Sequence, residues 1–254
     1  MAVEYRCTFD LIEAILSKHQ RETPMASNQE QRQQRQQQQL NDALIEAAEH
    51  GLLEDIQYLL GRHADINTRD CYNTHTPIHY ASAGGHHQCV ELLLDRHADV
   101  NALGRTYNYT PLHRASLFGH HQCIELLLDR HADIDALDCY TSTPLHHASK
   151  YGNHQCIEIL LDRHADINAC DYIKFTPLHH ASLNGHHHQC IEILLDRHAD
   201  INARDRNNFT PLHHASKYGN HQCIELLLEY GADKSLINVR LSLSLSQHMQ
   251  ASLS

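Results

Sequence analysis

The sequence predicts an all-α protein, a solenoid of stacked helix pairs, and three observations support this prediction. Residues 143–169 read TPLHHASKYGNHQCIEILLDRHADINA, and close copies lie on both sides. Within each copy, apolar residues recur at helical intervals on two short stretches separated by a glycine. The opening Thr-Pro pair recurs after 34, 33, 33 and 34 residues, at Thr76, Thr110, Thr143, Thr176 and Thr210. A repeat of this length is one supersecondary unit that buries its apolar face against its neighbours.

The first forty residues differ in composition from the repeats. Residues 9–19 have apolar side chains at helical spacing, which fits either a short amphipathic helix or a frayed, weakly ordered segment. Residues 28–39, NQEQRQQRQQQQ, have little apolar surface to bury, so we expect a disordered or transiently helical linker. Residues 1–40 are therefore predicted to be an N-terminal extension that is mostly disordered, and residues 1–24 are expected to be dispensable.

Residues 41–75 lack the Thr-Pro pair but have the same two-helix pattern and end in the same turn. Asp42 is placed to cap the first helix, and Gly51 falls where each later repeat also has its glycine. A terminal repeat has a neighbour on one side only, which accounts for charged residues such as Glu46 and Glu49. We expect this segment to be the N-terminal capping repeat.

The recurring residues of each full repeat have predictable physical roles. The threonine caps the first helix, and the proline occupies its first turn, where a missing N–H costs nothing. The glycine ends that helix, and an apolar stripe with one cysteine runs along the second helix. We expect these cysteines to be buried and reduced, because stacked helices lie farther apart than a disulfide allows. They are Cys89, Cys123, Cys156, Cys190 and Cys223.

A histidine follows the second helix in five of the repeats, and Gly231 takes its place in the last. Histidine tolerates positive φ better than most residues, so we predict a left-handed backbone at each. These histidines are His63, His97, His131, His164 and His198.

The period of about 33 residues with T-P-L-H-x-A at its head resembles the ankyrin-repeat family. The resemblance covers residues 41–241 and leaves residues 242–254 as a disordered tail. It implies a curved stack of antiparallel helix pairs with projecting β-hairpin fingers, and partner binding through the fingers and the concave first helices. The six repeats are 41–75, 76–109, 110–142, 143–175, 176–209 and 210–241.

The resemblance also carries implications for two sets of residues. The histidines of the T-P-L-H motif are expected to hydrogen-bond backbone near the Thr-Pro turn; they are His79, His113, His146, His179 and His213. Asparagines that follow Asp-Ile or Asp-Val can be hydroxylated by an asparaginyl hydroxylase in this family, and the alternative is a turn asparagine that bonds nearby backbone. These asparagines are Asn67, Asn101, Asn168 and Asn202.

Composition and motifs narrow the function further. Lys and Arg total 20 against 31 Asp and Glu, a formal charge of -11, which disfavours nucleic acid and anionic membranes as partners. With neither a signal peptide nor an apolar run of membrane-spanning length in this sequence, we expect a soluble monomer in the cytoplasm or nucleus. Motifs of hydrolases, zinc proteases and nucleotide-binding loops are absent, so we expect no enzyme, no catalytic residue and no cofactor.

The 26 histidines leave other hypotheses open. His147, His180 and His214, with Tyr80 and Arg114 at the earlier positions, are expected to form an exposed file on the concave side. Imidazoles suit transition metals, but spacing by a whole repeat does not match a compact zinc motif, so we predict no metal ligand. Exposed imidazoles titrate near pH 6.5, so the array could loosen or release its partner below about pH 6.

Comparison of the repeats locates a predicted recognition surface, because stacking positions must stay alike whereas positions that contact a partner can differ. The fingers differ most and carry aromatic residues, which are favoured in interfaces; alternatively, these residues pack between neighbouring fingers. We predict a non-enzymatic adaptor that binds another protein, with a His-rich metal- or acid-responsive protein and a structural spacer as alternatives. The predicted partner-binding residues are Tyr72, Tyr80, Tyr107, Tyr109, Arg114, Phe118, Tyr140, His147, Lys150, Tyr151, Tyr172, Phe175, His180, Phe209, His214 and Tyr218.

Overall fold

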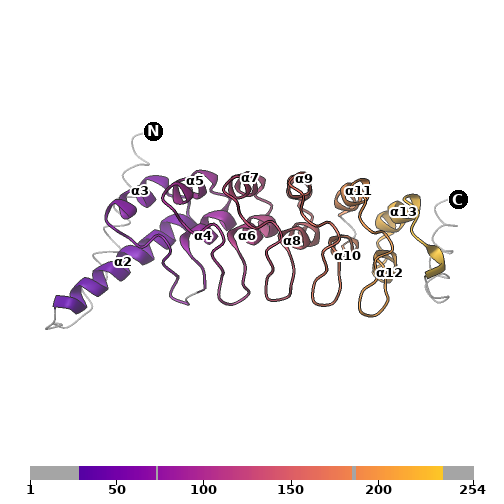
Figure 1. Ribbon diagram of the computed structural model, residues 1–254, viewed down its shortest axis with the longest axis horizontal. Helices are drawn as coiled ribbons and strands as arrows, with labels where there is room; N and C mark the ends of the chain where they lie inside the picture. The colour runs from indigo at the N-terminus through magenta and orange to yellow at the C-terminus, as the bar shows by residue number, and fades with distance from the viewer. Residues whose placement is uncertain (1–28, 73, 185–186, 237–254) are drawn as a thin grey trace. The chain divides into compact units, whose positions relative to one another are not determined.

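The computed structural model describes residues 29–72, 74–184 and 187–236. Within these ranges the regular structure is helical, as predicted, and no β-strand is present. The chain divides into two compact units, Met1–Ala115 with Glu125–Ala132, and Ser116–Ile124 with Asp133–Ser254. In each unit the first helices of the repeats lie between the second helices and the loops (Figure 1).

The first unit contains the capping repeat and the repeat that follows it. Helix α2 packs against both α3 and α4, and α5 packs against α3 and α4. The helices are α2 (Gln29–Glu49), α3 (Leu53–Gly61), α4 (Pro77–Gly84) and α5 (His87–Asp95), while α6 (Pro111–Phe118) and α7 (His121–Asp129) are divided between the units.

The second unit contains three full repeats. Its first helices α8, α10 and α12 pack in order, and its second helices α9, α11 and α13 form a second row on the side away from the loops (Figure 1). The helices are α8 (Pro144–Tyr151), α9 (His154–Asp162), α10 (Pro177–Ser182), α11 (His188–Asp196), α12 (Pro211–Lys217) and α13 (His221–Glu229), followed by a 3-10 turn at Lys234–Leu236.

The Gln-rich segment is helical from residue 29, which agrees with the helical alternative and not with the disordered one. Gln and Arg are good helix formers, and side chains four residues apart support one another. Gln37 Nε2 donates to Asn41 Oδ1 (3.1 Å), and Gln38 Nε2 donates to Asp42 Oδ1 (2.8 Å). Asp42 therefore lies inside α2 and does not cap it. Gln37 Nε2 also donates to the carbonyl of His63 (2.9 Å), which ties α2 to the turn after α3.

The predicted starts of the first helices are confirmed, and so is the glycine end of α8. Thr143 precedes α8 in an extended conformation, with Pro144 in the first turn, and the same arrangement opens α4, α10 and α12. Gly152 follows α8 with a φ of 79°, a left-handed value that glycine adopts at little cost.

The predicted second-helix core is confirmed as well. Cys156, Ile157 and Leu160 of α9 are fully buried, and the five cysteines of the stripe are free and buried. Burial raises the pKa of the Cys156 and Cys190 thiols to about 12, so both are protonated at neutral pH. The histidines after the second helices have φ between 64° and 68°, the left-handed backbone that the sequence predicts.

Several predictions lie outside the described residues. They concern the short helix at residues 9–19, the role of residues 1–24 and the tail at residues 242–254. In the part of the chain that the structure describes, no helix is long and apolar enough to cross a lipid bilayer.

Candidate functional site

Five loops connect each repeat to the next, and they occupy the place expected for the fingers. A backbone hydrogen bond closes the base of each, such as that from the Asp171 N–H to the Phe175 carbonyl (2.9 Å) or from the Gly104 N–H to the Tyr109 carbonyl (2.8 Å). The described residues of these loops form turns without strand ladders, so the β-hairpin form implied for the fingers is not found in the described ranges. The loops are 68–75, 102–109, 136–142, 169–175 and 203–209.

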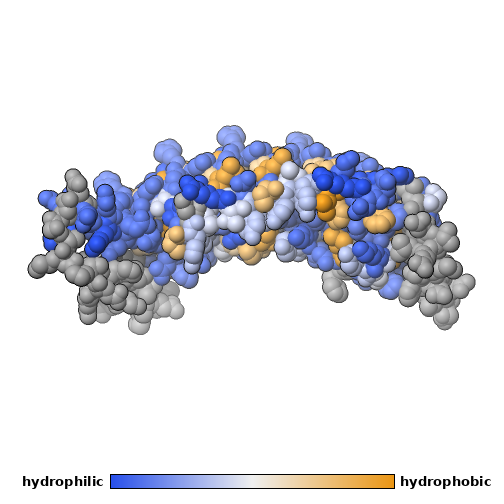
Figure 2. Space-filling model, turned by 90° about the horizontal axis from the view of Figure 1, so that it is seen from below, coloured by the Kyte–Doolittle hydropathy of each residue, from blue (hydrophilic) through white to orange (hydrophobic). Residues whose placement is uncertain are grey.

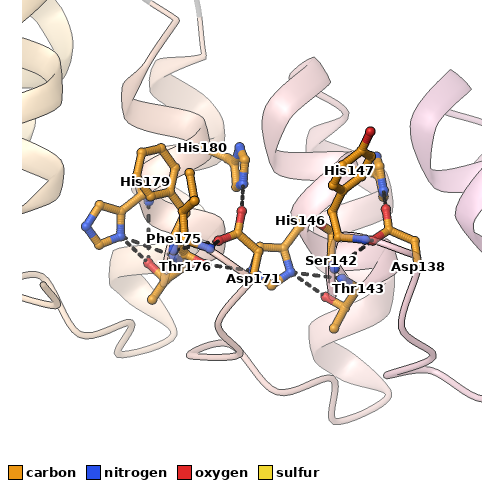
Figure 3. A network of polar contacts seen from close by, with 12 residues as sticks. Asp138, Ser142, Thr143, His146, His147, Asp171, Phe175, Thr176, His179 and His180 are labelled. Atoms are coloured by element: carbon orange, nitrogen blue, oxygen red, sulfur yellow. Dashed lines mark hydrogen bonds and ion pairs between the residues drawn. The ribbon is translucent and has the colours of Figure 1, made fainter. Parts of the chain in front are cut away.

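The T-P-L-H histidines hold the ends of these loops (Figure 3). The Thr143 N–H donates to Nδ1 of His146 (3.0 Å), so Nδ1 carries no proton. The proton is on Nε2, which donates to the Phe175 carbonyl at the end of the next loop (3.0 Å). His79 and His179 make the same contacts, to Tyr109 and Phe209. The predicted backbone role is confirmed for these histidines.

These histidines are neutral in the folded protein. Burial, which disfavours the imidazolium, lowers the pKa of His79 to about 3, against a weaker opposing effect of its bond to the Tyr109 carbonyl. Burial likewise lowers the pKa of His146 and of His179 to about 4. A charged ring would also place a second proton on Nδ1, against the N–H of the preceding threonine.

A buried aspartate organises the interior of four of the loops. Asp171 Oδ1 accepts hydrogen bonds from the Ile173 N–H (3.0 Å) and the Phe175 N–H (2.8 Å), and Oδ2 accepts one from His180 Nε2 (3.0 Å; Figure 3). Asp138 binds His147 in this way, and Asp205 binds His214. One carboxylate thus satisfies two backbone donors of the loop and one side chain of the first helix.

The electrostatics of these carboxylates favour the charged form. Burial alone would raise the pKa of Asp171, but hydrogen bonds from His180, Phe175 and Ile173 outweigh it, and the net pKa is lowered. The pKa of Asp138 and of Asp205 is lowered by the same balance. Each of these three loops is therefore built around a desolvated carboxylate that stays ionised at neutral pH.

The structure corrects the expectation of an exposed histidine file. His147 and His214 are buried, and His180 has a side chain only 12% exposed, because each ring turns inward to its aspartate. Phe175 is also buried, with its ring 4.7 Å from that of His214, so for this residue the packing alternative holds. These four side chains position the loops from beneath and do not offer contact area themselves.

The first unit uses different chemistry in its two loops. Asp70 accepts hydrogen bonds from the Thr74 N–H (2.7 Å) and from the Tyr80 hydroxyl (2.8 Å), so a tyrosine takes the place of the histidine. In loop 102–109 the aspartate position is Gly104 and the histidine position is Arg114. Arg114 is half-buried, and burial lowers its pKa.

Sequence reasoning missed the aspartates, although the chain contains a signal for them. In the last three loops an aspartate precedes the histidine by nine residues, as at Asp171 and His180. Where the histidine becomes Arg114, the aspartate becomes Gly104. The aspartate is kept where its partner can donate a hydrogen bond to it, as His180 and Tyr80 do, and is lost where the partner position is Arg114.

The exposed aromatic side chains gather on the loops and on the ends of the first helices. Tyr140 and Tyr172 of neighbouring loops lie 5.6 Å apart between ring centroids, and Lys150 Nζ lies 5.5 Å from the centroid of the Tyr151 ring. The surface on the loop side is mostly hydrophilic with small separate apolar groups (Figure 2). The exposed members of the predicted set are Tyr72, Tyr107, Phe118, Tyr140, Lys150, Tyr151, Tyr172 and Tyr218, and the half-buried ones are Tyr80, Tyr109, Arg114, His180 and Phe209.

Two further predictions concern the turns and metals. Asn168 Oδ1 accepts a hydrogen bond from the Asp200 N–H of the next repeat (2.9 Å), and Asn67 and Asn202 bind Asp99 and Asp233 in the same way. The turn role of these asparagines is confirmed, and their hydroxylation stays a prediction. Across the described ranges, no group of three or more His, Cys, Asp or Glu side chains is arranged to hold a metal ion.

Comparison with known proteins gives a consistent result. A family model described as ankyrin repeats (3 copies) matches residues 44–138, 105–171 and 145–238. The fold is similar to the crystal structure of the human ASB11 ankyrin repeat domain, with a TM-score of 0.69 and 31% sequence identity. That match covers 75% of this chain and 84% of the other. A search of curated proteins finds no match.

Proposed function

Because this chain belongs to the ankyrin-repeat family, whose repeats are in general protein–protein interaction modules, we propose that it is a non-enzymatic adaptor. In this proposal a partner protein contacts the loops and the exposed ends of the first helices. The second helices and the buried histidines serve as the scaffold. We further propose that the protein acts as a monomer in the cytoplasm or nucleus, where its free thiols stay reduced.

The observation that carries this proposal is the distribution of exposed aromatic side chains. On the second helices, among the described residues, large exposed apolar or aromatic side chains occur only at Tyr58 and Tyr230, in the first and last repeats. On the loops and first helices they occur in the first four repeats and in the sixth, for example at Tyr107, Tyr140 and Tyr218, while the fifth repeat has the half-buried Phe209. Tyrosine contributes large contact area at low conformational-entropy cost, so this side of each repeat is the one suited to a partner.

The hydrogen bonds beneath the loops support the same proposal. Asp171 fixes the backbone of its loop at Ile173 and Phe175, and His146 holds the end of that loop. A loop ordered before binding loses little conformational entropy when the partner arrives. Exposed tyrosines on rigid loops are therefore a recognition surface that needs no refolding.

Partner capture tests the proposal. Tagged wild-type protein, a loop variant and a matched control are used to capture partners from native lysate, with quantification by mass spectrometry. The loop variant carries Ala at Tyr140, Tyr151, Tyr172 and Tyr218, and the control carries Ala at Tyr58 and Tyr230. We expect partners that bind the wild type and the control but lose about tenfold or more with the loop variant. A partner set unchanged in the loop variant would contradict the proposal.

A further inference from the structure

Charges are segregated within the second unit. Its loops and first helices, residues 136–151, 169–184 and 203–218, contain no glutamate, and their only acidic residues are the three loop aspartates. All three are buried and hydrogen-bonded to a histidine. The basic residues of the same stretches are all exposed; they are Lys150, Lys174, Arg204, Arg206 and Lys217.

The second helices and the turns after them have the opposite balance. Their exposed carboxylates outnumber their cations, and a cation there has a carboxylate partner: Arg197 forms an ion pair with Asp162 (2.8 Å). The exposed carboxylates are Glu158, Asp162, Asp166, Glu192, Asp196, Asp200, Glu225, Glu229 and Asp233. The formal charge of -11 therefore conceals a cationic surface on the loops and first helices of this unit.

The cations of that surface are available to a ligand. Hydrogen bonds from Ser235 lower the pKa of the Asp233 carboxyl, and the positive charge of Arg204 adds to this effect. Lys150, Lys174, Arg206 and Lys217 form no ion pair with any carboxylate in the described part of the chain. Like charges without counter-charges repel one another, so the binding of an anionic ligand that neutralises them is favourable.

Two of the lysines are paired with exposed tyrosines. The sequence ASKYGN occurs at residues 148–153 and again at 215–220. Lys150 Nζ lies 5.5 Å from the centroid of the Tyr151 ring, and Lys217 Nζ lies 5.4 Å from that of Tyr218. Each pair offers an ammonium group for a carboxylate beside an aromatic face for an apolar side chain.

We propose that the loops and first helices of the second unit bind an acidic segment of a partner protein, in which Asp or Glu alternate with apolar residues. This inference rests on the proposed function and specifies the chemistry of its partner. The carboxylates would contact Lys150, Lys174, Arg206 and Lys217, and the apolar side chains would pack on Tyr151 and Tyr218. Nucleic acid is the less suited polyanion, because the net charge of the whole chain repels a long phosphate backbone.

A peptide-binding assay tests this inference on the full chain. The probe is a short fluorescent peptide in which Glu alternates with Leu and Pro, and fluorescence anisotropy reports its binding. A peptide with Gln in place of Glu and a single-stranded oligothymidine are compared with it. We expect the Glu peptide to bind, to weaken as salt rises from about 50 to 300 mM, and to bind better than either of the others.

Two variants with equal changes in charge locate the site. The test variant is K150Q/K174Q/R206Q/K217Q, and the control is R96Q/R163Q/R197Q/K234Q, whose substitutions lie outside the loops and first helices. Circular dichroism verifies that both are folded. We expect the test variant to lose about tenfold or more in affinity for the Glu peptide and the control to lose less than about twofold.

The results separate this inference from the proposed function. Equal affinity of the test variant and the wild type, or tighter binding of the oligothymidine or the Gln peptide, would overturn the inference. The proposed function fails separately, if the substitution of Tyr140, Tyr151, Tyr172 and Tyr218 leaves partner capture unchanged. A partner captured equally by the wild type and the charge variant would refute the acidic-segment inference while the adaptor proposal stands.

Discussion

The loop at residues 169–175 and the loop at residues 102–109 connect the same kinds of helices but are held by different chemistry. Each ends at a carbonyl that accepts a hydrogen bond from a buried histidine, His146 in one and His79 in the other. Loop 169–175 also has the ionised carboxylate of Asp171 at its centre. Loop 102–109 has Gly104 there and depends on backbone bonds, such as that from the Asn108 N–H to the Gly104 carbonyl (2.8 Å).

The comparison of these two loops shows that the buried histidine and the loop aspartate have separate structural roles within one repeat. The buried histidine belongs to the scaffold, since every full repeat has it whatever its loop contains. The aspartate belongs to the loop, since it fixes the backbone that presents the exposed tyrosine and can be exchanged together with its histidine. Recognition can therefore vary from repeat to repeat without loss of stacking.

Acid should destabilise the feature that the two loops share, the buried neutral histidine at the end of each loop. His79, His146 and His179 have a folded pKa of about 3 to 4, whereas a histidine in the unfolded chain titrates near 6.5. Between these values the unfolded state binds more protons, so the free energy of unfolding falls as the pH drops below about 6.5. Each histidine contributes up to about 1.4 kcal/mol per pH unit. Chemical denaturation at a series of pH values from 7 to about 4.5 measures this effect.

Two features sharpen the acid experiment. Asp171, whose folded pKa is lowered, contributes stability that is lost only below about pH 4, so it does not act in this window. The variant His146→Gln should be less stable at pH 7 but should depend on pH less steeply, because one of the neutral buried imidazoles is gone. A stability that stays flat between pH 6.5 and about 4.5 would show that these rings take up protons in the folded state.

Removal of the carboxylate should break only loop 169–175. Asp171→Ala leaves two backbone N–H groups and His180 without an acceptor, and we expect a loss of about 3 kcal/mol in the free energy of unfolding. Asp171→Asn keeps one acceptor oxygen and should cost about 1 kcal/mol. Urea denaturation compares the two variants. Equal, small losses would mean that the carboxylate is not what holds the loop.

Each of the two loops has one residue with positive φ, and substitutions at these two residues should change the stability less than removal of the carboxylate does. The two changes should have opposite signs. Lys174 has a φ of 62° and Asn108 a φ of 55°, and asparagine tolerates this region better than lysine. Lys174→Asn should therefore stabilise the protein, and Asn108→Lys should destabilise it, each by about 0.5 to 1 kcal/mol. Thermal unfolding of both variants provides the measurement. Shifts of the same sign would contradict this explanation.

Thiol labelling of the wild-type protein should distinguish the loops from the scaffold, and it requires no substitution that changes the stability. Loop 169–175 carries the exposed Cys170, whereas Cys156 and Cys190 are buried and have a pKa of about 12. In folded protein, Cys170 should react first with iodoacetamide, and the buried pair should react only on unfolding. Peptide mass spectrometry follows each site. Early labelling of Cys156 would show that the helices open more readily than this packing implies.

The sequence predicts the scaffold well because its positions are repeated and each has a local physical cause. Thr143, Pro144 and Gly152 mark the limits of a helix by themselves, and His164 follows from backbone geometry. The loops are less predictable because their order depends on partners in two elements. The contact between Asp171 and His180 becomes visible only when the repeats are compared position by position.

Two groups of polar residues have a structure that the sequence leaves open or predicts wrongly, and each case has a physical explanation. The polar composition of residues 29–39 predicts either a disordered or a transiently helical segment, and the structure has the helix, which glutamine side chains support and α3 and α4 stabilise. His147 and His214 were expected to be exposed because imidazole is polar, yet each has a buried carboxylate within reach. For the histidines, a hydrogen-bond partner outweighs the tendency of a polar group to face water, whereas residues 31–38 stay exposed on their helix.

The central claim is that the loops and first helices, and not the second helices, contact the partner. Hydrogen–deuterium exchange of the full chain, with and without the captured partner, tests this claim most directly. We predict slower exchange in residues 136–151, 169–184 and 203–218 on binding, and unchanged exchange in α9, α11 and α13. Protection confined to those second helices would contradict the account.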